Sequence, residues 1–309
     1  MSKVNDEYEA SLKSIETENC LDRWFYRRVG FRIAVLLRNT GITPNMITIF
    51  SIFVGAASGP LFYYDNLAYT LIGIVCLIAA NILDCVDGQL ARITGIKSEI
   101  GRILDGLAGD IWFILIYVFL ALRLDNEYST LMFFIPAVLS GISHFVQANI
   151  TDYYKTLHLL FVSREKGGEF QNFDEVRAKY NGMKPGIGKV LFFFYLGYTS
   201  LQEAVTPKLQ LLLKNLHSKY EGDIPENIRT EFRSRSGRLM KRFIDLMTFN
   251  GRSVVLFIVL LTGHVWIYFF FEIVVLNIVL AISIRKHENI CSRILADLQS
   301  EQILSNSKL

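Results

Sequence analysis

Four aspartates lie within one short, otherwise apolar stretch of the sequence, and their spacing indicates a metal site. Asp84 and Asp87 are three residues apart, and Asp105 and Asp110 follow where the next apolar segment opens. On a helix, residues three apart share one face, so oxygens of Asp84 and Asp87 can meet one cation. Hard cations prefer oxygen ligands, and Mg²⁺ commonly joins a few carboxylates to the phosphates of its substrate. We therefore expect Mg²⁺ or Mn²⁺ on Asp84 and Asp87, with Asp105 completing the cluster.

Small residues and one arginine flank these carboxylates. Gly88 and Gly101 remove side chains where a helix or a phosphate must approach closely, and Ala91 keeps the same corridor narrow. Arg92 follows Gly88 by four residues, about one helical turn, so it can pair with a phosphate or with one of the carboxylates. The pattern predicts a nucleotide site beside the cation.

A simpler reading exists for each aspartate taken alone, namely a solvated carboxylate at a helix end that meets a nearby arginine. Charged groups at membrane depth are costly unless they are paired, hydrated or bound to metal. Two carboxylates on one face, small residues beside them and a third carboxylate on the next segment occur together here. For the whole set we therefore favour the metal site.

The elements that must position these residues are helices that cross a membrane. Apolar residues make up 51% of the chain, and they are gathered into runs near the length that crosses a hydrocarbon core of roughly 30 Å as helix. We expect an all-α, polytopic membrane protein with about six transmembrane helices and an amino-terminal interfacial helix over residues 21–38. The expected spans are 44–64, 67–86, 102–122, 131–150, 254–261 with flanking residues, and 265–284.

The fifth of these spans is short, and the stretch 254–284 offers an alternative as one long tilted helix interrupted near Gly263. Orientation follows from basic residues, which gather in the amino-terminal arm, the 92–102 connection, the region after the fourth span and the carboxyl-terminal tail. The opposite loops offer only Arg123. The positive-inside rule therefore predicts that both termini are cytoplasmic.

Other site chemistry finds little support. The four cysteines lack CxxC spacing and the five histidines form no HxxxH or HExxH pair, so we interpret the cysteines as reduced packing residues and expect no histidine metal site. The net charge is +3 and no interleaving of basic and aromatic residues is present, which gives no indication of a nucleic-acid partner.

At the aspartates the chain resembles the CDP-alcohol phosphotransferase (phosphatidyltransferase) family. The family signature reads Asp, two residues, Asp-Gly, two residues, Ala-Arg, about eight residues, Gly, three residues, Asp, three residues, Asp. The stretch 42–48, ITPNMIT, is similar to the segment that opens the first span and helps hold CDP in this family, which makes Asn45 and Thr48 binding candidates beside Gly88, Ala91, Arg92 and Gly101. The positions that match the signature in type and spacing are Asp84, Asp87, Gly88, Ala91, Arg92, Gly101 and Asp105.

One position departs from the family signature. The last Asp of the signature is expected at 109, where this chain has Gly109, and the nearest carboxylate is Asp110. In the family this Asp binds metal and is the proposed base, so the resemblance makes Asp110 a candidate for both roles, with Asp105 mainly a ligand. A displacement of one residue turns a side chain by about 100° on a regular helix, and a π-bulge would restore its direction. The alternatives are that another residue supplies the base, or that the protein is inactive.

The resemblance implies transfer of a phosphatidyl group from CDP-diacylglycerol to a small polar alcohol, with release of CMP. Inositol or inositol phosphate is the favoured acceptor, as in a phosphatidylinositol phosphate synthase-like member, because Arg252, Arg285 and Lys286 stand at expected cytoplasmic helix ends. Basic residues at such ends are also expected from topology and snorkelling alone. Alternatives are transfer of a phospho-alcohol from a soluble CDP-alcohol to a lipid, a divalent-cation transporter and an inactive scaffold.

Four parts follow along the chain. Residues 1–41 are expected to form a cytoplasmic amphipathic segment, 42–152 spans one to four with the metal and CDP site, 153–250 a cytoplasmic and partly interfacial insertion, and 251–309 the last two spans with the tail. The expected partners are the two substrates, the lipid bilayer and a second copy of the chain in a homodimer, the last implied by the resemblance alone.

Overall fold

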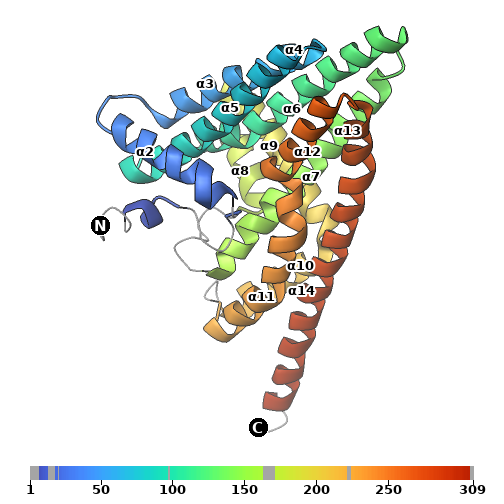
Figure 1. Cartoon of the computed structure of the whole chain (residues 1–309). Coiled ribbons are helices and arrows are strands. Elements are labelled where there is room, and N and C mark those ends of the chain that lie inside the picture. Colours follow the sequence, from blue (N-terminus) through green and yellow to red (C-terminus); the bar gives the residue numbers. More distant parts are fainter. Residues whose placement is uncertain are drawn as a thin grey trace. The chain divides into compact units, whose positions relative to one another are not determined.

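Every regular element in the described part of the chain is a helix, as expected (Figure 1). The computed structural model describes residues 7–12, 18–19, 21–96, 98–162, 171–220 and 224–306. The chain forms two compact units, one made of Met1–Ala148 with Leu246–Asn277 and the other of Asn149–Asp245 with Ile278–Leu309. The division into four parts expected from the sequence stays a prediction.

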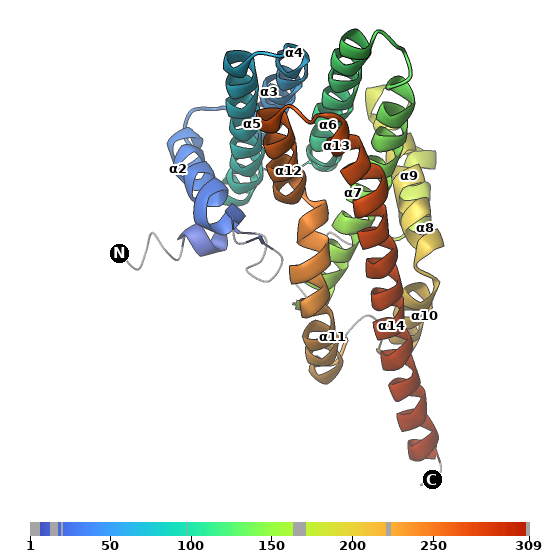
Figure 2. The same ribbon diagram turned by 45° about the vertical axis from the view of Figure 1, so that its right-hand side comes forward.

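The first unit carries the aspartates on two long helices, α5 and α6. The helices α3 and α4 pack along both of them, and α2 lies beside α5 (Figure 2). Ala34, Ile47, Val86 and Leu90 form one buried apolar cluster that joins α2, α3 and α5. The elements of this unit are η1 (Asp22–Tyr26), α2 (Arg27–Leu37), α3 (Pro44–Ala56), α4 (Ser58–Tyr63), α5 (Leu67–Thr94), α6 (Glu99–Tyr128), the first half of α7 (Phe134–Val162), α12 (Phe249–Thr262), α13 (Trp266–Phe270) and η5 (Phe271–Val275).

Capping residues fix where the helices around the aspartates begin and end. The side chain of Asn66 accepts a hydrogen bond from Ala68 N at 2.9 Å at the start of α5, which satisfies a backbone donor that the helix leaves free. At the other end of α5, Gly95 has a φ of 72°, the left-handed conformation that glycine adopts without strain. The α5 segment with both of its aspartates is thus one continuous helix.

Close helix packing in this unit depends on a glycine opposite a large ring. A Cβ atom added at Gly55 of α3 would lie 2.5 Å from ring atoms of Trp112 on α6, closer than real Cβ atoms approach other atoms. The Trp112 side chain is buried. The small residue therefore permits the short distance between α3 and α6, the helices that carry Thr48 and Asp105.

Within the described residues, four helices are long and apolar enough to cross a membrane, which indicates an integral membrane protein. They are Pro44–Tyr63, Leu67–Thr94, Glu99–Tyr128 and Trp266–Ser300, and a fifth span results if the helices of Glu226–Met247 and Phe249–Thr262 are counted as one broken span. The predicted span at 131–150 corresponds to part of α7, which is not among them. The total of six therefore stays a prediction.

The interruption expected near Gly263 is present, and it separates two helices rather than dividing one long span over 254–284. Gly263 has a φ of 77° and ends α12, and a separate helix, α13, begins at Trp266. A left-handed glycine at this position terminates the preceding helix in the usual way. The chain thus forms two helices joined at Gly263.

The second unit contains the insertion, whose described residues form helices. On α9, Phe192 is buried while Phe193 and Phe194 are exposed, an arrangement that fits the partly interfacial character expected of the insertion. Its elements are α8 (Phe173–Gly182), α9 (Ile187–Val205), α10 (Pro207–Tyr220), α11 (Glu226–Leu239), η3 (Met240–Ile244), the second half of α7 and most of α14 (Leu276–Asn306).

Candidate metal and nucleotide site

Three of the four aspartates meet at one point of the first unit. Asp84 and Asp87 on α5 and Asp105 on α6 each bring an oxygen atom within 4.8 Å of the other two. Asp87 is only 3% exposed, whereas Asp105 is exposed, so one side of the cluster is open to a ligand. A donor set made only of carboxylate oxygens fits Mg²⁺ or Mn²⁺.

Thr48 on α3 fixes the direction of the buried carboxylate. Its hydroxyl donates a hydrogen bond to Asp87 Oδ2 at 2.5 Å, and Thr48 is itself buried. Hydrogen bonds of this kind orient the carboxylates that bind metals. The sequence pattern made Thr48 a nucleotide-binding candidate, and the structure adds this contact with an aspartate.

Asn45 and Gly101, two further candidates, lie together at the starts of α3 and α6. Asn45 Nδ2 donates to Ser98 Oγ at 3.2 Å, and Gly101 N donates to the same oxygen at 2.9 Å. A Cβ atom on Gly101 would collide with Asn45 Oδ1 and lie 2.7 Å from Ser98 Oγ. The glycine is therefore needed for the approach of the Asn45 side chain to the first turn of α6.

The remaining candidates on α5, Gly88, Ala91 and Arg92, meet the amino-terminal segment. Arg92 Nε donates to the backbone carbonyl of Ser11, and a Cβ atom on Gly88 would lie 3.2 Å from Arg92 Nη2. Ala91 is half-buried beside them. No pattern in the sequence predicted that Ser11 contacts the motif arginine.

Arg27 on α2 adds a positive charge near the carboxylates. Its Nε atom donates to Glu18 Oε2 at 3.0 Å. Burial acts to lower the pKa of Arg27, but Cys85, Glu18, Asp22 and Asp84 outweigh burial and raise it. The positive charge of Arg27 therefore partly offsets the negative charge of the cluster, a role that only the fold reveals.

Tyr26, the residue before Arg27, remains a neutral phenol at neutral pH. Burial is the main cause that raises the pKa of Tyr26 to about 12, and the nearby charge of Asp22 adds to it. The Tyr26 side chain is buried. It therefore adds no negative charge beside the three carboxylates.

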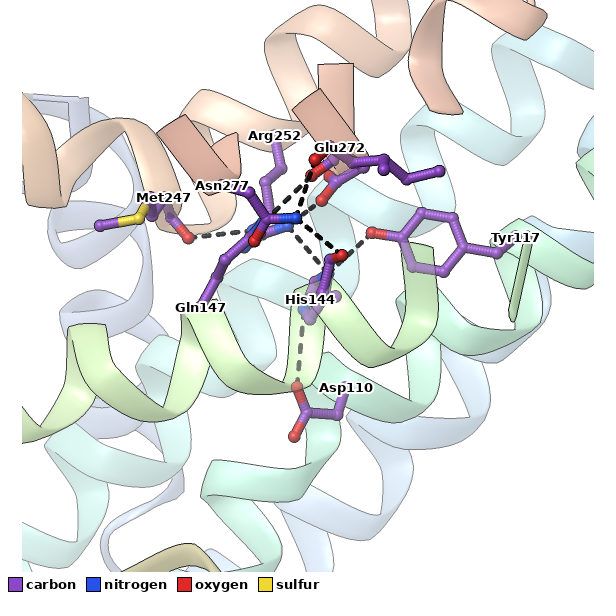
Figure 3. A network of polar contacts seen from close by, with 10 residues as sticks. Asp110, Tyr117, His144, Gln147, Met247, Arg252, Glu272 and Asn277 are labelled. Carbon is purple, nitrogen blue, oxygen red and sulfur yellow. Dashed lines mark hydrogen bonds and ion pairs between the residues drawn. The ribbon is translucent and has the colours of Figure 1, made fainter. Parts of the chain in front are cut away.

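Asp110 is not part of the group formed by the three carboxylates, and it contacts His144. Its Oδ1 atom is 3.5 Å from Nε2 of His144 on α7, and both side chains are buried (Figure 3). The helix α6 is a regular α-helix from Glu99 to Tyr128, so the π-bulge considered from the sequence is not present. Five residues on a regular helix turn a side chain by about 140° net, which points Asp110 away from the face of Asp105. The role of Asp110 as metal ligand or base stays a prediction.

The contacts of Asp110 continue into a buried network around Arg252 (Figure 3). Arg252 is 1% exposed and forms an ion pair with Glu272, which is 0% exposed. It also donates to Gln147 Oε1 at 2.7 Å, to the carbonyl oxygen of Met247 at 2.9 Å and to His144 Nδ1 at 3.1 Å. These donors serve contacts inside the unit, and the role of Arg252 in acceptor binding stays a prediction.

The same network fixes the protonation of His144. A guanidinium group only donates, so Nδ1 of His144 must accept the hydrogen bond from Arg252. The ring proton of a neutral imidazole then sits on Nε2, facing Asp110. No signal in the sequence marks this contact, since Asp110 and His144 stand on different helices without a shared motif.

The other two acceptor candidates belong to the second unit. Arg285 and Lys286 are exposed on α14, and Lys286 Nζ lies 4.0 Å from the centroid of the Phe243 ring. A cation over an aromatic face is a favourable contact that needs no substrate. The role of both residues in acceptor binding stays a prediction.

Comparison with known proteins places the carboxylate cluster in a family. Residues 41–162 match the model of the CDP-alcohol phosphatidyltransferase family. Over 77 residues the chain is 40% identical to the ceramide phosphoethanolamine synthase of Drosophila melanogaster. This aligned stretch covers 23% of this chain and 20% of that protein. Over 74 residues the chain is 40% identical to the archaetidylinositol phosphate synthase of Pyrococcus horikoshii. This aligned stretch covers 24% of this chain and 38% of that protein.

The chain thus spans well under half the length of these curated relatives. The matched segment nevertheless contains α3 to α6 with all three clustered aspartates. Members of the matching family are transferases. The match to the CDP-alcohol phosphatidyltransferase family thus covers residues 41–162 of this chain, the part that carries the carboxylate cluster.

Proposed function

We propose that this protein transfers a phosphatidyl group from CDP-diacylglycerol to a small polar alcohol in a membrane and releases CMP. The observation that carries the proposal is the meeting of Asp84, Asp87 and Asp105, whose oxygens lie within 4.8 Å of one another inside the family domain. Inositol or inositol phosphate is the acceptor we favour. The name of the Pyrococcus horikoshii relative, an archaetidylinositol phosphate synthase, supports this choice.

In the proposed reaction, the oxygen of the acceptor hydroxyl forms a bond to the β-phosphorus of the donor, and the bond from that phosphorus to CMP breaks. Asp84, Asp87 and Asp105 would hold Mg²⁺ or Mn²⁺, which when bound offsets the charge of the pyrophosphate and orients it. Arg92 stands one turn from Gly88 on the same helix and would pair with a donor phosphate after giving up its contact with Ser11.

The proton of the acceptor hydroxyl requires a carboxylate base. Asp110 is the candidate that the family resemblance supplies, although its contact with His144 directs it into the packed part of the unit. A base contributes about 10²- to 10⁴-fold to a rate. An enzyme that lacks one at position 109 would therefore be slow rather than inert, because the aspartate cluster still positions the donor.

A second candidate function is the transfer of a phospho-alcohol from a soluble CDP-alcohol to a lipid acceptor. The Drosophila melanogaster relative, named a ceramide phosphoethanolamine synthase, favours it. Both versions use the same aspartates and release CMP, so the two differ in which substrate carries the lipid chains. We further propose cytoplasmic termini and a homodimer, as expected from basic-residue positions and from the family resemblance.

The experiment that tests the proposal is CMP release by the purified full chain with Mg²⁺ or Mn²⁺. CDP-diacylglycerol is offered with inositol phosphate, inositol, glycerol phosphate or serine, and CDP-ethanolamine is offered with ceramide or diacylglycerol. Metal-dependent CMP release with one pair identifies the reaction, and Asp87→Asn should remove it. Asp174→Asn, at an exposed position at the start of α8, is the matched control and should retain it.

A membrane protein that moves ions or that only serves as a scaffold would give a different result. Either would release no CMP with any substrate pair, and a scaffold would also bind no CDP in the presence of Mn²⁺. Metal-dependent CDP binding without CMP release would show that the protein binds its donor but does not carry out the transfer. Substitutions at position 109 would then test whether a missing base is the cause. Release of CMP that survives Asp87→Asn would contradict the proposed role of the cluster.

A further inference from the structure

A second group of metal-ligating side chains lies in the second unit, outside the family domain. His287, Glu288 and Cys291 on α14 each bring one ligand atom within 4.8 Å of the other two. His287 and Cys291 are four residues apart on the helix, and both are fully buried. The sequence motif His-Glu-Asn-Ile-Cys therefore places an imidazole and a thiol on one helix face.

The distance between these two groups fits the two ligands of one tetrahedral cation. Cys291 Sγ lies 3.7 Å from His287 Nδ1. Zinc binds thiolate sulfur at about 2.3 Å and imidazole nitrogen at about 2.1 Å, so a tetrahedral angle separates the two ligand atoms by about 3.6 Å. The observed separation equals this value within about 0.1 Å.

The amino end of α10, which packs beside α14 at this point, holds the Glu288 carboxylate in a fixed direction. Its two carboxylate oxygens accept hydrogen bonds from Lys208 N at 2.7 Å and Leu209 N at 3.2 Å, at the amino end of α10. Carboxylates that bind metals are usually oriented by such hydrogen bonds from neighbouring groups. A cation at this position would connect α14 to the start of α10 through Glu288.

The surroundings of the group contain buried polar atoms that the described residues do not satisfy. His287 Nε2 and the Tyr154 hydroxyl have no hydrogen-bond partner among them. The Tyr154 ring stacks on the His287 ring with centroids 4.1 Å apart. Buried polar groups without partners are rare in folded proteins. An imidazole that binds metal through Nδ1 keeps its proton on Nε2, where a bound water can accept it.

We propose that His287, Glu288 and Cys291 bind a divalent cation of the zinc class, separate from the cation at the three aspartates. Thiolate and imidazole select zinc-like metals, whereas an all-carboxylate group selects Mg²⁺ or Mn²⁺. The cation joins α14 to α10 within the second unit and takes no part in the transfer reaction. This revises the expectation from the sequence that the cysteines only pack and that no histidine binds metal.

The test uses the purified full chain, freed of metal by a chelator and then loaded with Co²⁺ or Zn²⁺. Cobalt bound to a thiolate gives a sulfur-to-metal charge-transfer absorption band, which carboxylates cannot produce. We expect this band in the wild-type protein, displacement of the cobalt by Zn²⁺, and one zinc ion retained per chain by elemental analysis. Wild-type protein without the band would overturn the proposal, and this measurement needs no variant.

Substitutions then assign the ligands. Cys291→Ser and His287→Gln should remove the band or weaken Co²⁺ binding by at least about ten-fold. Glu288→Gln keeps an oxygen for the amide donors of α10 and should weaken binding while the helix content measured by circular dichroism stays unchanged. Cys76→Ser, at a half-buried cysteine in the first unit, is the matched control and should keep the band.

Independence from the aspartates is tested with Asp84→Asn, which should leave the cobalt–thiolate band unchanged. A band that survives both Cys291→Ser and His287→Gln would show that another thiol binds the metal and would overturn the assignment. An absent band would establish the other outcome, in which Cys291 and His287 share a hydrogen bond without metal and Glu288 only caps α10.

Discussion

Replacement of Gly109 by aspartate tests which residue supplies the base. Position 109 follows Asp105 by four residues on a regular α-helix, so their side chains differ in direction by about 40°, compared with about 140° for Asp110. A Cβ atom added at Gly109 would meet nothing within 4 Å. A carboxylate at position 109 therefore extends on the same side of α6 as Asp105 without a steric cost.

The expected magnitude follows from these directions. The change from glycine to aspartate raises the helix propensity at this position by about a few tenths of a kcal/mol. A general base contributes about 10²- to 10⁴-fold to a rate. If Asp110 is directed away from the acceptor, Gly109→Asp should raise kcat for CMP release by about 10²-fold or more, and the gain should persist when Asp110→Asn is added.

The assay is CMP release with Mn²⁺ at saturating donor and acceptor, compared for wild type, Gly109→Asp and Gly109→Asn. The Asn variant has the same shape without the charge and should stay at the wild-type rate. No gain in Gly109→Asp, combined with a loss of about 10²-fold or more in Asp110→Asn, would refute the reasoning from helix geometry. Asp110 would then be the base in spite of its contact with His144.

Three further substitutions test contacts that position the site. Thr48→Val removes the hydrogen bond to Asp87 and should raise the Mn²⁺ concentration needed for half-maximal activity by about 10- to 100-fold, whereas Thr48→Ser should retain the wild-type value. Arg252→Met leaves Glu272 buried without its partner and should lower the free energy of unfolding in detergent by about 3–5 kcal/mol. Arg252→Met with Glu272→Leu should recover most of this loss, and failure to recover would indicate another role for Arg252. Gly55→Ala should destabilise the chain by about 1–3 kcal/mol because the methyl group overlaps an indole ring, and unchanged stability would contradict the packing described.

The carboxylate cluster was predictable because its signal is local. Asp84 and Asp87 share a helix face by their spacing alone, and Asp105 opens the next apolar segment. The helical fold followed in the same way from the length of the apolar runs. The span count did not, because α7 contains many polar residues in a long helix, and its hydropathy alone does not distinguish a span from a packed helix.

Contacts between distant positions could not be predicted from the sequence. Arg252 was expected to bind the acceptor because it stands at an expected cytoplasmic helix end, as basic residues do in the family it resembles. Only the fold brings Glu272, Gln147 and His144 around it. The pair of His287 and Cys291 is a different case. Its spacing of four residues is visible in the sequence, but motifs that pair two histidines do not include a cysteine as the second ligand.

The ion pair between Arg252 and Glu272 also has a consequence for how the chain is made. The two residues are twenty positions apart, on either side of the turn at Gly263. A lone arginine or glutamate is costly to insert into a bilayer, and Arg252 is synthesised before its partner. The hairpin of α12 and α13 with η5 is therefore best inserted as one piece, with the two charges neutralising each other as they leave water.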